Sequence, residues 1–348
     1  MCSRDGGLGE EVMKILINGA WCCTLLLMCS GLLSPIVMAQ DMPKIVRLEG
    51  NPIIRPEMLP AKDGENINGP SLIRVPEWIE EPLGKYYLYF AHHVGQYIRL
   101  AYADSLVGPW EIYEPGTLRL EDTVCDDIQE TSWAEYRHVA SPDVHIDNEA
   151  KKIVMYFHGP MYLSGPRDEY ASYAQRSLVA TSADGIDFEA KSELLGTSYF
   201  RVFQWQSRYY ALGMPGNFYR SEDGLDGFKK GPTLFTSDMR HCALTIRDDT
   251  LYVFYTIVGE NPERILLSTI RLTEDWMTWK ESPPVVLLKP EMEWEGALLP
   301  AEPSARGFAP GPVRQLRDPA LYEEDGKTYL LYAVSGESGI AVARVVWP

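Results

Sequence analysis

Short runs of apolar and aromatic residues recur along the chain from about residue 45, separated by turns rich in Gly, Pro, Asp and Asn. Scarcely any stretch shows the 3.6-residue spacing of an amphipathic helix. The runs are instead rich in Tyr, Val, Leu, Ile and Phe, which is typical of β-strands bounded by turns. The pattern therefore predicts an all-β fold.

One kind of run returns five times in similar surroundings, each time after a polar turn. The five runs are residues 86–90, 153–157, 209–213, 251–255 and 328–332. In four cases another strand follows, and then an acidic turn leads to an aromatic residue, as in Ser182-Ala-Asp-Gly185 before Phe188. Repeats made of strands indicate a propeller in which each unit is one blade. We predict one five-bladed β-propeller over residues 41–348; a β-sandwich is the alternative, but it has no reason to repeat such turns.

The last unit shows only three obvious strands, which end at Val346. The segment Lys44–Glu49 precedes the first unit and has the composition of a strand. Because a closed ring removes the exposed edge of the last blade, we predict that this segment supplies the missing outer strand.

The charge balance excludes some functions. The 348 residues are 45% hydrophobic, which is enough for a large core, but 32 Lys and Arg stand against 49 Asp and Glu, a net charge of -17. Such a chain repels a phosphate backbone, so nucleic-acid binding is excluded. No apolar run in the body of the chain reaches the roughly 20 residues of a membrane helix. The sequence does not indicate an oligomeric state.

Residues 1–40 have the parts of a secretory signal: Lys14, an apolar core, and the small Ala39 at the exit. Met13 is an alternative start, and cleavage is expected near Gln40. We therefore expect a secreted or periplasmic protein that has no membrane contact after cleavage; a retained anchor is the alternative.

Four of the six cysteines lie in this N-terminal segment, which leaves Cys125 and Cys242 in the rest of the chain. Two cysteines are too few for a disulfide scaffold or a cysteine metal site. One bridge between them would be permitted in an exported protein.

In a propeller the first strand of each blade lines the central channel, so the heads of these strands converge. These heads are polar, where an ordinary strand would begin with apolar residues. They are Asn68-Gly-Pro-Ser71, Ser141-Pro-Asp-Val144, Tyr199-Phe-Arg-Val202, Arg240-His-Cys-Ala243 and Arg317-Asp-Pro-Ala320. Asp143 and Asp318 are the carboxylates of the set, with arginines and His241 around them. Two such carboxylates can divide acid and base roles if their surroundings separate their pKa values, although Asp beside Pro also simply favours a turn.

These strand heads resemble the blade openings of the five-bladed propeller glycosidases, which include glycoside hydrolase families 43, 32, 62, 117 and 130, over five repeats from Asn68 to Trp347. The resemblance implies a glycosidase that acts on plant or algal polysaccharide fragments, with inversion through a water molecule. Two alternatives stay open. One is a phosphorylase in which Arg201, Arg240 and His241 hold phosphate; the other is a propeller that binds carbohydrate without cleaving it.

The resemblance also implies roles for single residues. Asp143 matches the aspartate that orients and tunes the acid. The first blade carries Asn68 where the base is expected, and the third blade has no Glu at its head, so the base role passes to Asp318, beside Arg317. We expect arginines to keep both aspartates ionised. The acid would then come from a loop, and the candidates are Glu263, Glu295 and Glu302.

Other side chains could contact the sugar. His92, His93, His145 and His158 lie at or near strand ends close to the channel, where they could bind hydroxyl groups or act as the acid; ordinary packing is the alternative for each. Trp133 lies in a polar loop and offers a flat apolar face to a sugar ring.

Histidine spacing gives no sign of a catalytic metal, because no His-x-x-x-His or comparable ligand pattern occurs. We expect no cofactor, although a structural Ca²⁺ could occupy the channel. The expected partner is an oligosaccharide or polysaccharide.

Overall fold

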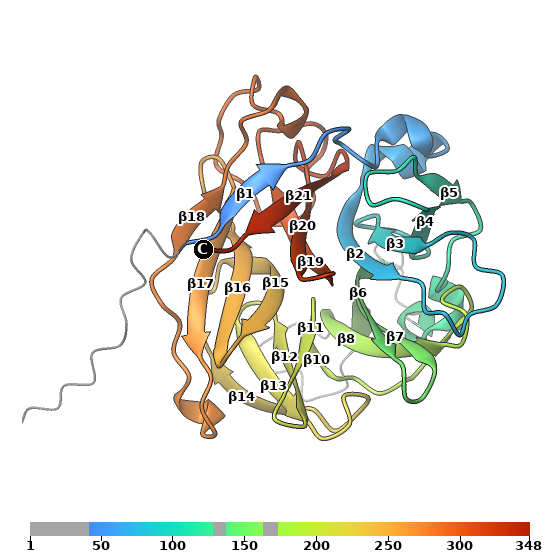
Figure 1. Cartoon of the computed structure of the whole chain (residues 1–348), viewed down its shortest axis with the longest axis vertical. Helices are drawn as coiled ribbons and strands as arrows, with labels where there is room; N and C mark the ends of the chain where they lie inside the picture. The colour runs from blue at the N-terminus through green and yellow to red at the C-terminus, as the bar shows by residue number, and fades with distance from the viewer. Residues whose placement is uncertain (1–41, 128–136, 163–172) are drawn as a thin grey trace, which may run out of the picture. The chain divides into compact units, whose positions relative to one another are not determined.

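The five repeated runs form the second strands of five antiparallel sheets, which are arranged as blades around a central axis (Figure 1). The computed structural model describes residues 42–127, 137–162 and 173–348. The predicted signal segment and Trp133 lie outside these residues. The structure confirms the five-bladed β-propeller.

Each blade opens with an inner strand and proceeds outward. Blade 1 contains β2 (Asn68–Arg74), β3 (Tyr86–Ala91), β4 (Arg99–Ala103) and β5 (Glu111–Tyr113). Blade 2 contains β6 (Ala140–Asp147), β7 (Lys152–Tyr162), β8 (Tyr173–Ser182), β9 (Phe188–Ala190) and β10 (Gly196–Thr197). Blade 3 contains β11 (Arg201–Trp205), β12 (Arg208–Gly213), β13 (Asn217–Ser221) and β14 (Lys229–Thr233). Blade 4 contains β15 (Met239–Arg247), β16 (Thr250–Ile257), β17 (Ile265–Arg271) and β18 (Val285–Leu288). Blade 5 contains β19 (Arg317–Glu324), β20 (Lys327–Ala333), β21 (Ile340–Val346) and β1 (Lys44–Arg47).

Short 3₁₀ turns connect some strands. They are Pro56–Met58, Ala61–Glu65, Leu120–Asp122, Val124–Asp127, Trp276–Thr278 and Glu293–Glu295. Among the described residues no helix has the length and apolarity needed to cross a membrane.

The N-terminal strand closes the ring as predicted. β1 pairs antiparallel with β21, with Lys44 opposite Val346 and Arg47 opposite Ala343. Blade 5 therefore combines three strands from the C-terminal end of the chain with one from residues 44–47, which lie side by side in Figure 1. This pairing ties the two ends of the propeller together without a covalent bond.

The hydrophobic core is divided among the five interfaces between neighbouring blades. Strand β3 is apolar or aromatic at every position because both of its faces are buried. Successive side chains of a strand point to opposite faces, so Tyr86, Leu88 and Phe90 pack against blade 5, while Tyr87 and Tyr89 pack against blade 2. A strand buried on both faces reads as a continuous apolar run, and this makes the repeats visible in the sequence.

The acidic turns stabilise the contacts between blades. The carboxylates of Asp184 and Asp223 each accept two backbone N–H bonds in equivalent turns of blades 2 and 3. Tyr89 of blade 1 donates to a carbonyl of the first turn, and Tyr156 of blade 2 donates to the matching carbonyl of the second. The repeated Ser-x-Asp-Gly sequence therefore has a repeated structural role.

Candidate active site

The heads of the five inner strands share an unusual backbone conformation. Each contains a residue with positive φ: Gly69, Ser141, Tyr199, His241 and Asp318. In blades 1, 2, 4 and 5 the strand pairing shifts register beside this residue. For residues other than glycine this conformation is disfavoured, and such strain is common at functional sites. Residues at or next to these positions from all five blades meet at the axis.

A small cavity of about 40 Å³ lies at the axis. Its lining is almost entirely polar and comes from all five blades. The lining residues are Asn68, His93, His138, Ala140, Ser141, His158, Gln175, Tyr199, Met214, His241, Asp318 and Glu337. A water molecule takes about 30 Å³ in the liquid, so this space suits one or two waters and is far below the ~300 Å³ of a pocket for a whole ligand.

Asp318 is the predicted carboxylate that reaches this cavity, and its side chain is 3% exposed. The hydroxyl of Tyr199 donates to its Oδ1 at 2.9 Å. Its Oδ2 has no hydrogen-bond partner among the described residues and lies 3.7 Å from Nδ1 of His241. Burial, together with the charge of Glu337, raises the pKa of Asp318 to about 7. The expectation that arginines keep Asp318 ionised is therefore corrected: at neutral pH it is partly protonated.

Glu337 is a second carboxylate of the cavity, and the sequence analysis missed it. It lies between β20 and β21 and is 2% exposed. Arg317 Nη1 donates to its Oε1 at 2.6 Å, and the side-chain amides of Asn66 and Asn68 donate to its Oε2. In the sequence Glu337 lies outside the heads of the inner strands, which explains why an inspection of those heads did not identify it. The available signal was a Glu between glycines in the Ser335–Gly339 turn.

Arg240 and Arg317 are paired with glutamates rather than with Asp318. Arg240 forms a two-point ion pair with Glu263, whose Oε2 also lies 3.5 Å from Nε of Arg317. Arg317 in turn pairs with Glu337. Two arginines and two glutamates therefore alternate in one buried network, and Asp318 is an additional carboxyl group without a cation of its own. Its raised pKa follows from this arrangement.

Four histidines surround the cavity, and the predicted His93, His158 and His241 are among them. The fourth, His138, was not predicted. Their rings and that of Tyr199 follow one another at centroid distances of 5.1–6.4 Å. Burial lowers the pKa values of His93, His158 and His241, so these imidazoles are neutral. Nδ1 of His158 and of His241 has no partner among the described residues, which leaves both atoms available to a bound molecule.

His92 does not line the cavity. Its Nδ1 accepts from the backbone N–H of Val94, and burial lowers its pKa to about 4.

Asp143 lies outside the cavity, contrary to the expectation that the two aspartates converge. Its Oδ2 accepts from the backbone N–H of Val202 at 2.8 Å and lies 2.9 Å from Nε2 of His145. Burial alone would raise its pKa, but His145 and Arg201 reverse this and lower it. The reason for the displacement is register: Ser141, two residues earlier, holds the position that Asp318 holds in blade 5. Asp143 and His145 thus join blades 2 and 3.

Arg201 also holds blades together. Its Nε donates to the carbonyl of Cys242, and its Nη1 donates to those of Ser141 and Pro142 at 3.1–3.3 Å. The guanidinium lies 4.3 Å from the ring centre of Tyr199. Arg201 thereby connects the inner strands of blades 2, 3 and 4.

The three loop glutamates predicted as acids lie in different surroundings. Glu263 is buried in the arginine network. Glu295 is fully buried and accepts from Arg47, from the Tyr332 hydroxyl and from two backbone N–H groups. Glu302 is exposed, and it lines a different pocket. Neither Glu263 nor Glu295 has a carboxylate face open to a substrate.

Glu295→Gln is expected to lower the free energy of unfolding by about 2 kcal/mol, because Arg47 and the backbone donors lose a charged acceptor. Urea unfolding measures this change. A variant of normal stability that has lost turnover would contradict the structural role and restore Glu295 as an acid.

The described residues contain no group of three or more His, Cys, Asp or Glu side chains arranged to hold a metal ion, so the structure offers no support for Ca²⁺ in the channel. Cys125 and Cys242 are buried free thiols rather than a disulfide, and burial raises both pKa values.

Comparison with known proteins gives one clear relative. Protein R118 of Acanthamoeba polyphaga mimivirus, which is uncharacterized, is 37% identical over 328 residues, covering 86% of this chain and 90% of that protein. No family model matches the chain.

Solved structures show the same fold at low identity. A putative glycoside hydrolase from Bacteroides ovatus has a TM-score of 0.54 at 14% identity, over 86% of this chain and 96% of that one. An α-L-arabinofuranosidase from Lactobacillus brevis has a TM-score of 0.51 at 13% identity, over 90% and 95%. A family GH43_1 enzyme from Xanthomonas citri has a TM-score of 0.52 at 13% identity, over 80% and 88%, and it has also been solved with xylotriose. The resemblance to the five-bladed propeller glycosidases is therefore confirmed at the level of fold.

Proposed function

The chain belongs to the family of protein R118 of Acanthamoeba polyphaga mimivirus, and from its glycosidase fold we propose that it is a glycoside hydrolase acting on plant or algal polysaccharide fragments. The observation that carries the proposal is Asp318: a buried carboxyl group at the axis, with one free oxygen, facing a cavity large enough for water. We place the sugar above this cavity and the attacking water within it.

Asp318 acts as the base in this proposal. Tyr199 fixes its Oδ1, so that Oδ2 and Nδ1 of His241 face the water together. As Asp318 takes one proton from the water, the water oxygen bonds to the anomeric carbon and the glycosidic C–O bond breaks. The leaving oxygen then takes a proton from the surrounding solvent. A base with a pKa near the working pH is efficient, because it is both available and strong. The pKa of about 7 at Asp318 meets this condition.

Phosphorolysis has less support. The phosphate would need Arg240, whose guanidinium is already held by Glu263 through two hydrogen bonds, and Arg201, which donates to four carbonyls. If Arg240 bound phosphate in place of Glu263, the buried carboxylate of Glu263 would lose its main counter-ion. A buried charge without a partner destabilises the protein strongly.

A propeller that binds carbohydrate without cleaving it is the second candidate. The observation that favours it is that, of the five positive-φ positions, Asp318 alone carries a carboxylate, since blades 1 to 4 have Gly69, Ser141, Tyr199 and His241 there. Release of sugar distinguishes the candidates. Suitable substrates are the 4-nitrophenyl glycosides of α-L-arabinofuranose and β-D-xylose, together with arabinotriose and xylotriose.

Asp143→Asn should leave turnover of these substrates within a few-fold of the wild type, because Asp143 lies outside the cavity. It should lower the free energy of unfolding by about 1–2 kcal/mol, because the Val202 N–H and His145 lose a charged acceptor. Steady-state kinetics and urea unfolding measure the two effects. Loss of turnover in a fully stable variant would place Asp143 in the catalytic machinery instead.

A further inference from the structure

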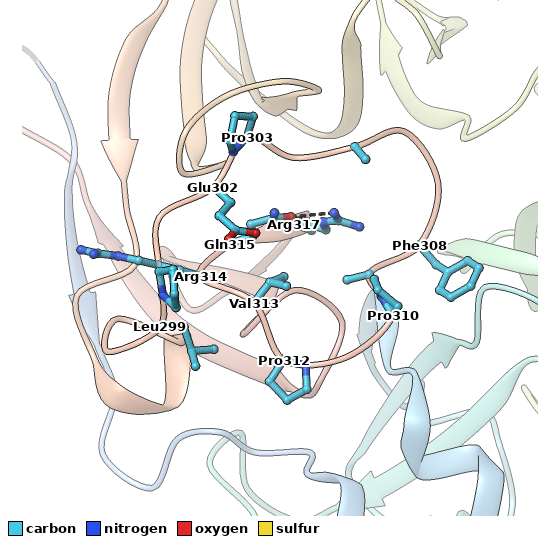
Figure 2. A pocket seen from close by; sticks show the side chains of 13 residues that line it. Leu299, Glu302, Pro303, Phe308, Pro310, Pro312, Val313, Arg314, Gln315 and Arg317 are labelled. Carbon is cyan, nitrogen blue, oxygen red and sulfur yellow. Dashed lines mark hydrogen bonds between the residues drawn. The ribbon is translucent and has the colours of Figure 1, made fainter.

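A second, larger pocket of about 290 Å³ lies under the long connection between β18 and β19 (Figure 2). Its size is close to that of pockets that hold small ligands. Its walls include Leu299, Phe308, Val313 and several prolines, whose rings present flat, rigid apolar faces. The connection therefore forms a preformed hollow.

Glu302 and Gln315 each have a hydrogen-bonding group in this pocket that is not used within the described part of the chain. Glu302 makes no hydrogen bond or ion pair with any described residue, and it lines the pocket together with Gln315 (Figure 2). Oε1 of Gln315 accepts from Nε and Nη2 of Arg317 at 3.0 and 2.6 Å, which fixes the amide. Its amide nitrogen has no acceptor within the described part of the chain. Arg314 also lines the pocket, and its Nε has no hydrogen-bond partner among the described residues. The pocket thus offers a charged acceptor, a neutral donor and a guanidinium donor between apolar walls.

The pocket lies next to the axial cavity. Arg317 lines the pocket, and on its other side it bonds Glu337, which lines the cavity. The carbonyl of Gly307 accepts from both Arg240 and Arg317 at 3.1–3.3 Å. The ring of Phe308 lies 5.6 Å from that of His93, centre to centre. The pocket and the axial cavity therefore share the wall that Arg317 forms.

We propose that this pocket binds the sugar residue on the leaving-group side of the cleaved bond, with Glu302 accepting a hydrogen bond from one of its hydroxyl groups and Gln315 donating to another. A sugar ring has apolar C–H faces and hydroxyl edges, and this pocket offers both kinds of surface. The inference rests on the proposed hydrolase function and extends it: the substrate is at least a disaccharide rather than a simple glycoside.

Glu302→Gln tests the proposal, with Glu293→Gln as its control, because Glu293 is an exposed glutamate of the same connection outside the pocket. Loss of a charged acceptor should weaken binding of arabinotriose or xylotriose, whichever the wild type binds, by about 10-fold or more, as measured by calorimetry. KM for that trisaccharide should rise equally. Turnover of the nitrophenyl glycoside should fall much less than that of the trisaccharide, because its leaving group has no hydroxyl group to donate to Glu302. Leu299→Trp, which fills the pocket, should act in the same direction.

Three results would overturn the proposal. One is unaltered trisaccharide binding with a reduced kcat in Glu302→Gln, which would make Glu302 the general acid. Another is an equal loss on both kinds of substrate, and the third is the absence of trisaccharide binding by the wild type. If the wild type binds but does not hydrolyse the trisaccharide, and Glu302→Gln still weakens binding, the pocket is supported and the hydrolase function fails.

Discussion

Asp318→Asn is expected to reduce turnover of the nitrophenyl glycosides by a factor on the order of 10² or more, with the fold intact. The substitution keeps the shape of the side chain and its bond from Tyr199, but it removes the oxygen that takes the proton from water. Steady-state kinetics on purified variants measure the effect, and circular dichroism checks the fold. The turnover of Asp143→Asn, measured beside it, is the matched comparison.

Normal turnover in a folded Asp318→Asn variant would contradict this assignment. Since Glu337 is tied to Arg317 and two asparagine amides, it could not replace Asp318 without breaking these bonds, and the catalytic group would have to lie outside the axial cavity.

The pH dependence of stability should report the same group. The pKa of Asp318 is about 7 in the folded protein against 3.8 for an ordinary aspartate, so between these values the folded state holds a proton that the unfolded state has released. Stability therefore falls as pH rises through this window. At 1.36 kcal/mol per pKa unit, the wild type should lose about 4 kcal/mol relative to Asp318→Asn between pH 4 and pH 8.

Urea unfolding of both proteins across this range measures the difference. The comparison with Asp318→Asn cancels the titration of the groups that do not interact with Asp318. Parallel stability curves would show that Asp318 titrates normally and that its burial does not control its charge.

The sequence was sufficient to predict the blades because their second strands are buried on both faces. Tyr86 to Phe90 is apolar throughout for this reason, and the equivalent strands repeat it. The closing strand was also predictable, because Lys44–Arg47 had no partner of its own and blade 5 lacked a strand. These features depend on local composition and on the count of repeats.

The site was harder to predict from the sequence, because its chemistry depends on contacts between residues that are far apart in the chain. Glu337 contacts Asn66, which lies 271 positions away, and Glu295 contacts Arg47, which lies 248 positions away. Nothing in the local sequence distinguishes a glutamate that is held by several donors from one that is free.

The prolines at the heads of the inner strands indicate which side chain of each head reaches the axis. The positive-φ residues of blades 1, 2 and 5 are Gly69, Ser141 and Asp318, and each of them is followed directly by a proline. An alignment on these prolines would have placed Ser141, not Asp143, opposite Asp318. The backbone position, rather than the presence of an aspartate, decides which side chain reaches the axis.

The pH dependence of kcat/KM for release of free sugar by the wild type, in phosphate-free buffer, tests whether Asp318 is the catalytic base of a hydrolase. We expect hydrolysis without phosphate and a rate that rises with pH through an apparent pKa near 7, as Asp318 loses its proton and becomes the base. Retention of the glycan with no sugar released, or a rate that falls through the same pH range, would contradict it.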